Sequence, residues 1–168
     1  MLVLRLFERL FGFLFINLCR CHAVHDAYVA VDDADALPGG IEPDEDPDDN
    51  FTDAGNTYYT GYLATAKRLG ISAGVGNNLY APAKEITRQE MFTLLYNALK
   101  LIGQLPQGRS GKTLSDFTDT GQISAWAEKA MTLLVETDTV SGSGGKLNPD
   151  GTTTRAEMAQ VLYNLLGK

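Results

Sequence analysis

A pattern that returns after 66 or 67 positions constrains the fold more than any other feature of this sequence. The opening Phe-Thr-Asp of residues 51–53 recurs at residues 117–119, an offset of 66. A Thr-Arg-x-Glu-Met motif at residues 87–91 recurs at residues 154–158, an offset of 67. Self-similarity at a fixed period indicates tandem copies of one supersecondary unit. The sequence therefore predicts two structural repeats.

Each copy contains two stretches in which apolar residues recur at helical spacing, separated by a glycine-rich loop (residues 70–76 and 140–145). A period of 3.6 residues predicts α-helices whose apolar stripe faces the core. We therefore expect an all-α fold with two main helices per copy. The predicted stripes are Tyr58, Tyr59, Tyr62, Leu63, Ala66 and Leu69, then Met91, Leu94, Leu95, Ala98, Leu99 and Ile102, and in the second copy Trp126, Ala127, Ala130, Met131, Leu134 and Val135, then Met158, Val161, Leu162, Leu165 and Leu166.

The Thr-Arg-x-Glu motif predicts how the second helix of each copy begins. A threonine three residues before a glutamate forms a capping box, in which each side chain binds a backbone N–H of the first turn. The arginine inside the box lacks such a role, because a cation near a helix N-terminus is mildly unfavourable. Its presence in both copies, as Arg88 and Arg155, predicts an anionic group nearby.

The negative charge of the chain lies in one segment. Eleven acidic residues and no Lys or Arg lie between Asp26 and Asp53, whereas the residues from Ala54 onward carry eleven basic and nine acidic side chains, a balance of +2. This near-neutral region has no basic stripe typical of nucleic-acid binding. No apolar run reaches the length of about 18 residues that a membrane span needs.

The N-terminal segment, residues 1–39, is open to three interpretations: a signal-like leader cleaved after Ala23, an amphipathic helix, or the remnant of an altered repeat. Cys19 and Cys21 are too close for an ordinary disulfide, and their spacing is poor for a zinc site, so no metal site or other cofactor is expected. The Asp- and Pro-rich residues 40–50 are predicted to form an acidic linker.

No arrangement of residues predicts catalysis. Both histidines lie before residue 26, and the two repeated aspartates, Asp53 and Asp119, belong to separate copies of one motif rather than to an acid–base pair. Gly111-Lys112-Thr113 resembles the end of a phosphate-binding loop, but Pro106 replaces the required first glycine. We therefore expect neither an enzyme nor a nucleotide-binding protein.

Taken together, the Phe-x-Asp opener, the glycine loop and the Thr-Arg-x-Glu helix resemble the S-layer homology (SLH) repeat of bacterial surface proteins. The resemblance implies SLH repeats at residues 51–103 and 114–168, joined by a connector at 104–113. In this family three repeats commonly assemble into a three-pronged spindle. Grooves between the prongs bind the secondary polymer of the Gram-positive cell wall, often through a pyruvylated sugar. The resemblance thus implies a non-catalytic, extracellular anchor at the cell wall, with self-association or protein docking within a surface layer as the alternative.

The resemblance also implies a set of carbohydrate-binding residues. A guanidinium can bind the carboxylate of a ketal-linked pyruvate with paired hydrogen bonds, although a surface salt bridge is the other interpretation of each arginine. For the aspartates a turn-holding role is at least as well supported, and for the tryptophan core packing is the alternative. The implied residues are Arg88, Arg155, Gly74, Gly142, Trp126, Tyr58, Asp53 and Asp119.

The sequence departs from the family pattern at three points. Asp138 stands where the first copy has Gly70, which predicts a strained or shifted loop. Gln89 replaces the usual small residue of the Thr-Arg-Ala-Glu motif. No complete third repeat is visible, so we expect a partial spindle that associates with a third SLH repeat or with another chain.

Overall fold

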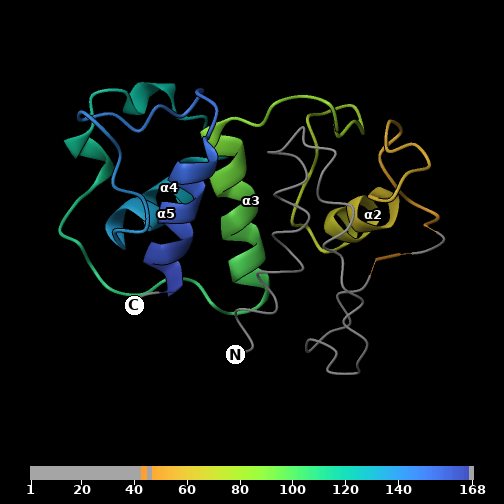
Figure 1. Ribbon diagram of the computed structural model, residues 1–168, viewed down its shortest axis with the longest axis horizontal. Helices are drawn as coiled ribbons and strands as arrows, with labels where there is room; N and C mark the ends of the chain where they lie inside the picture. Colours follow the sequence, from red (N-terminus) through yellow and green to blue (C-terminus); the bar gives the residue numbers. More distant parts are fainter. Residues whose placement is uncertain (1–42, 45–46, 167–168) are drawn as a thin grey trace. The chain divides into compact units, whose positions relative to one another are not determined.

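The computed structural model describes residues 43–44 and 47–166, and its regular structure is helical (Figure 1). The predicted signal, remnant helix and cysteine cluster of residues 1–39, and part of the linker, lie outside the described residues. The described residues form isolated β-bridges but no strand, which confirms the all-α prediction. The helices are α2 (Thr60–Arg68), α3 (Arg88–Leu101), α4 (Glu128–Glu136) and α5 (Arg155–Leu166), with short 3₁₀ turns η1 (Leu114–Asp116) and η2 (Thr120–Gln122).

None of the helices in the described part of the chain has the length and apolarity needed to cross a bilayer. The three-pronged arrangement of a spindle stays a prediction.

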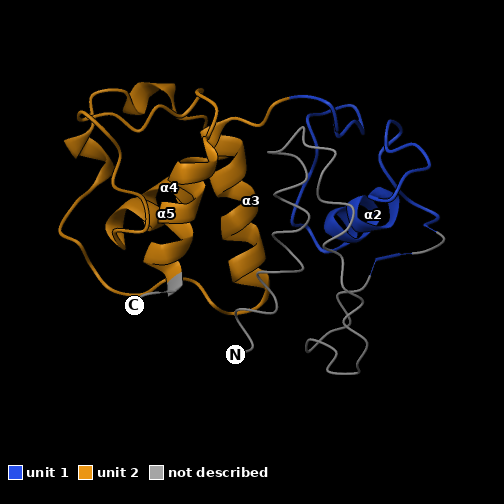
Figure 2. Ribbon diagram, in the orientation of Figure 1, with its two compact units in different colours: residues 1–84 blue, residues 85–168 orange. Residues whose placement is uncertain are grey.

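The chain divides into two compact units, residues 1–84 and residues 85–168 (Figure 2). The division falls inside the predicted first repeat, between its two helices. Unit 1 contains α2, whereas α3 lies in unit 2 together with α4 and α5.

Unit 1 has a small core formed by Phe51, Ala54 and Leu63, with Tyr59 and Tyr80 packed against it. Gly70 follows the C-terminal end of α2 with a φ of 69°, a left-handed conformation typical of a helix end. The next two backbone N–H groups, of Ile71 and Ser72, both donate to the carbonyl of Ala66.

In unit 2, α3 packs against α4, and most of the predicted stripes are buried. Helix α3 is buried on more of its circumference than the sequence predicts, because residues outside its stripe are covered as well. These additional buried residues are Arg88, Gln89, Phe92 and Tyr96. An amphipathic surface helix leaves its polar face in solvent, so α3 is covered on two sides.

Both predicted capping boxes are confirmed. The hydroxyl of Thr87 accepts from the N–H of Glu90, and the Glu90 carboxylate accepts from the N–H of Thr87 at 2.7 Å. The second copy repeats these bonds between Thr154 and Glu157. The polar ends of both helices are therefore satisfied locally, as the sequence alone predicts.

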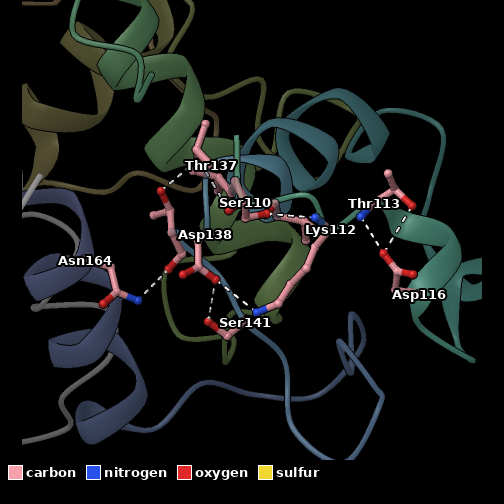
Figure 3. Close-up of polar contacts among 11 residues, drawn as sticks. Ser110, Lys112, Thr113, Asp116, Thr137, Asp138, Ser141 and Asn164 are labelled. Atoms are coloured by element: carbon pink, nitrogen blue, oxygen red, sulfur yellow. Dashed lines mark hydrogen bonds and ion pairs between the residues drawn. The ribbon is translucent and has the colours of Figure 1, made fainter. Parts of the chain in front are cut away.

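Asp138 does not shift the second loop, contrary to one of the two expectations. Its φ of 55° matches the 69° of Gly70, so the aspartate adopts the left-handed conformation that glycine takes in the first copy. Figure 3 shows its carboxylate bonded to Lys112 Nζ at 3.1 Å and to Ser141 Oγ at 3.2 Å. These bonds hold the connector against the loop, and Ser110 adds a bond to the carbonyl of Val135.

Candidate carbohydrate-binding site

The repeated aspartates hold the loop that precedes each capping box. In unit 2, the two carboxylate oxygens of Asp119 accept the N–H groups of Leu147 at 3.0 Å and Asn148 at 2.7 Å. In unit 1, Asp53 binds the N–H groups that follow its own loop, those of Tyr80 at 2.8 Å and Ala81 at 2.7 Å. Both aspartates hold backbone N–H groups, as the sequence indicates, but these groups lie 27 to 29 residues away in the loop before the capping box rather than in the turn beside the aspartate.

These bonds lower the pKa of both carboxyl groups. For Asp53 the N–H of Tyr80 is the largest cause, and it outweighs the opposing effect of desolvation. For Asp119 desolvation is the largest single effect and raises the pKa, but the N–H groups of Leu147 and Asn148 and the charge of Lys146 together outweigh it. Both aspartates are therefore ionised acceptors at neutral pH.

Arg88 is a buried residue, with 7% of its surface exposed. Its Nε donates to the carbonyl of Leu147 at 2.9 Å, its Nη1 donates to Glu157 Oε1 at 2.8 Å, and its guanidinium lies 5.3 Å from the centre of the Phe92 ring. The backbone of Leu147 is thus held at its N–H by Asp119 and at its carbonyl by Arg88. In this structure, the guanidinium of Arg88 serves the packing of the two repeats.

The loop glycines are required by close contacts within the protein. A Cβ on Gly142 would lie 2.5 Å from Cε1 of Phe117 and 2.6 Å from the carbonyl oxygen of Lys146. A Cβ on Gly74 would meet the corresponding groups of the first copy, Phe51 and the carbonyl of Leu79. Each glycine also has a positive φ, 71° for Gly74 and 66° for Gly142. Only glycine fits both requirements without strain.

Gln89 is the residue whose importance the sequence did not reveal. Its Nε2 donates to Oδ1 of Asp150, and its Oε1 accepts from the N–H of Ser124 at 2.9 Å. Its backbone N–H donates to the carbonyl of Pro149 at 3.0 Å. The side chain links α3 to two separate loops of the second copy. Its departure from the small residue usual in the motif was the available signal, but only the partners explain it.

Three of the predicted ligand residues are exposed. Trp126 is 55% exposed and Tyr58 is 66% exposed. Each lies in the turn just before a helix, ahead of α4 and α2 respectively, rather than on the buried stripe that we predicted for them. Core packing of Trp126 is therefore wrong, because the helix begins after it and the stripe starts at Ala127. Arg155 is also exposed, and within the described part of the chain its guanidinium has no hydrogen bond or ion pair.

The structure thus separates the eight predicted residues into two groups. Arg88, Asp119 and Gly142 meet at the loop of residues 142–148 in unit 2, and they hold it in place. Asp53 and Gly74 do the same for the loop of unit 1. The other three residues are exposed to solvent instead, namely Trp126, Arg155 and Tyr58. A role in carbohydrate binding stays a prediction for all eight.

Comparison with known proteins places the chain in a family. The model of the S-layer homology domain matches residues 50–92 and 116–159. The chain is 30% identical over 119 residues to the S-layer protein sap of Bacillus anthracis, covering 71% of this chain and 14% of that protein. It is 32% identical over 134 residues to the surface-layer 125 kDa protein of Lysinibacillus sphaericus, covering 76% of this chain and 11% of that protein.

An enzyme is also among the relatives. The chain is 31% identical over 120 residues to the exoglucanase XynX of Acetivibrio thermocellus, covering 70% of this chain and 11% of that protein. The chain therefore spans about a seventh or less of the length of these three relatives. The family match and the S-layer relatives indicate a module that anchors proteins at the cell surface, in association with the cell wall, and they favour a non-catalytic role. With two matched repeats that cover the described loops and capping boxes, this chain belongs to the S-layer homology domain family.

Proposed function

We propose that this chain anchors a protein to the cell wall by binding a secondary cell wall polymer that carries pyruvylated sugars. A ketal-linked pyruvate presents a carboxylate, and guanidinium groups bind carboxylates with charge-assisted hydrogen bonds. The observation that carries the proposal is the exposed Arg155 side chain, whose guanidinium is unpaired within the described residues. The chain itself contributes binding, and no catalytic step is assigned to it.

The exposed aromatic residues support the same proposal. Trp126 and Tyr58 are each more than half exposed at corresponding positions of the two copies. Aromatic rings combine a large apolar face with low conformational entropy, which suits the apolar face of a sugar ring. Since the two residues lie in different units, each is proposed as a separate contact.

The test compares two preparations of the same cell wall. Purified protein is mixed with polymer-bearing walls before and after chemical removal of the pyruvate, and the retained fraction is measured. We expect strong retention on untreated walls and a large loss after the treatment. Equal retention on both preparations would refute recognition of pyruvate.

A second candidate function is self-association within a surface layer. The bond between Arg88 and Glu157 favours it, because it shows that the arginine of one Thr-Arg-x-Glu box binds the glutamate of another repeat. Arg155 has no such partner among the described residues and could take one from another chain. This candidate predicts retention on walls that does not depend on pyruvate.

A further inference from the structure

The turns that carry Tyr58 and Trp126 are held in different ways, although each lies just before the first helix of a repeat. The turn of Tyr58 is held locally, by the side chain of Thr60. Its Oγ1 accepts the N–H of Thr57 at 2.8 Å and donates to the carbonyl of Gly55 at 2.9 Å. These partners lie three and five positions away in the sequence, so the first copy holds this turn by itself.

The turn of Trp126 lacks this threonine. The segment between the Phe-Thr-Asp opener and the helix is two residues longer in the second copy. Glu128 stands at the position of Thr60, and among the described residues no side chain caps α4. The N–H of Ser124, which shortly precedes Trp126, donates instead to Oε1 of Gln89 at 2.9 Å. An acceptor 35 positions away in the sequence therefore holds this turn.

Asp150 orients the amide of Gln89. An ionised carboxylate only accepts hydrogen bonds, so Nε2 of Gln89 faces Oδ1 of Asp150 and the amide oxygen faces the N–H of Ser124. Gln89 is 4% exposed, and its own N–H donates to the carbonyl of Pro149 at 3.0 Å. Burial and these three bonds favour one conformation of the side chain. In this conformation it joins the turn of Trp126 to the loop of residues 147–151.

The loop of residues 147–151 leads to Arg155, the exposed cation of the proposed site. Arg88 also holds this loop, because its Nε donates to the carbonyl of Leu147 at 2.9 Å and its N–H donates to the carbonyl of Gly151 at 2.8 Å. The first turn of α3 is therefore a common base for the loop that precedes α5 and for the turn that precedes α4. Gln89 makes the bond from this base to the turn.

We infer that Gln89 is a positioning residue for polymer binding, which fixes the turn of Trp126 relative to the loop that leads to Arg155. The inference rests on the proposed function and adds a residue that does not itself contact the ligand. Groups that are fixed before binding lose less conformational entropy when the ligand arrives, so a fixed turn strengthens binding. The equivalent position of the second copy is Ala156, whose methyl group cannot make these bonds.

The test uses the full chain and the fluorescence of Trp126, its only tryptophan. Gln89→Met keeps an unbranched side chain of similar size but removes both side-chain hydrogen bonds. In the absence of polymer, we expect time-resolved anisotropy to show faster local motion of the indole. Soluble fragments of the pyruvylated polymer should bind about three- to tenfold more weakly, which corresponds to one neutral hydrogen bond. Ser110→Ala is the control, because it removes a hydrogen bond to the carbonyl of Val135 rather than to the turn or the loop.

Gln89→Ala is a second variant, and it is expected to fold because the motif already carries alanine in the second copy. Circular dichroism of each variant checks that the helices are retained. Unchanged motion of the indole in both variants would overturn the inference, whether or not the chain binds polymer. Faster motion with unchanged polymer binding would overturn the role of Gln89 in binding. Failure of the unmodified chain to bind the fragments would refute the proposed function instead, and the anisotropy would still decide whether Gln89 positions Trp126.

Discussion

Nη1 of Arg88 lies 2.8 Å from Oε1 of Glu157, and this ion pair joins the capping boxes of the two repeats. The other oxygen of the same carboxylate accepts from the N–H of Thr154 at 2.8 Å. The pKa of Glu157 is lowered most strongly by the hydrogen bond from the backbone N–H of Thr154. The side chain of Thr154 and the charge and hydrogen bond of Arg88 lower it further, whereas desolvation raises it. One carboxylate therefore both starts α5 and pairs with the buried arginine of α3.

Replacing Glu157 with glutamine separates these two roles. Glutamine can keep the capping box but removes the charge that faces Arg88. Because the glutamate is partly exposed, we expect Glu157→Gln to lower the free energy of unfolding by about 1–2 kcal/mol, near the lower range for a charged hydrogen bond. Urea unfolding followed by circular dichroism measures the change. Glu128→Gln, at an exposed position in the first turn of α4, is the control and should have little effect. A similar loss in both variants would contradict the role of the ion pair.

A second prediction concerns the contact between Gly142 and Phe117. Alanine at residue 142 must accept a positive φ and also displace the ring and a carbonyl. Gly144 has a φ of 57°, but a Cβ there would meet nothing within 4 Å. We expect Gly144→Ala to cost about 1 kcal/mol for the left-handed conformation, and Gly142→Ala to cost about 2 kcal/mol more for overpacking. Thermal and urea unfolding of the two variants would measure the difference, and equal losses would argue against the close contact.

The depressed pKa values predict how stability depends on pH. Asp119 and Glu157 have pKa values below their ordinary values in the folded chain. Their contribution to stability is therefore complete above the pKa of the unfolded chain, about 4, and is lost as the pH falls through the lower folded values. We expect the free energy of unfolding to decrease steadily in this acid range. In Asp119→Asn the decrease should be shallower, because one carboxyl group with a lowered pKa no longer titrates. If the free energy of unfolding of the variant fell with pH as steeply as that of the unmodified chain, Asp119 would not contribute to the pH dependence of stability.

The two arginines are predicted to differ in what their removal affects. Arg155→Ala should weaken wall binding by about 1.5–3 kcal/mol, the scale of a charged hydrogen bond, with unfolding unchanged because the side chain is exposed. Arg88→Ala should instead lower the free energy of unfolding, since it leaves the carbonyl of Leu147 and the carboxylate of Glu157 without their partner. Retention on untreated walls and urea unfolding are measured on the same preparations. Unaltered retention in Arg155→Ala would remove its ligand role.

Trp126 provides an intrinsic probe, because it is the only tryptophan of the chain. Its exposure predicts red-shifted emission that acrylamide quenches efficiently. Soluble fragments of the wall polymer should reduce this quenching if a sugar ring stacks on the indole. Quenching that is the same with and without saturating polymer would exclude contact with Trp126.

The sequence alone determined the local and repetitive parts of this protein. The capping boxes and most of the helical stripes follow from interactions between residues a few positions apart, and the repeats follow from motifs that occur twice. The resemblance to the SLH family was confirmed for the same reason, since it rests on the order and spacing of those motifs. For Asp53 and Asp119 the sequence indicated a bond to backbone N–H groups but not which groups, because these lie 27 to 29 residues away.

Only the tertiary structure decided what lies against each repeated motif. Arg88 and Arg155 occupy the same position of the repeated motif, yet one is buried against Glu157 and the other is exposed. Trp126 likewise fits a helical stripe, but α4 begins two residues later and leaves the indole in solvent. The physical reason is that burial depends on groups 60 or more positions away in the sequence, such as Glu157 for Arg88. A periodic pattern is the same in both copies, so it cannot predict which copy is buried.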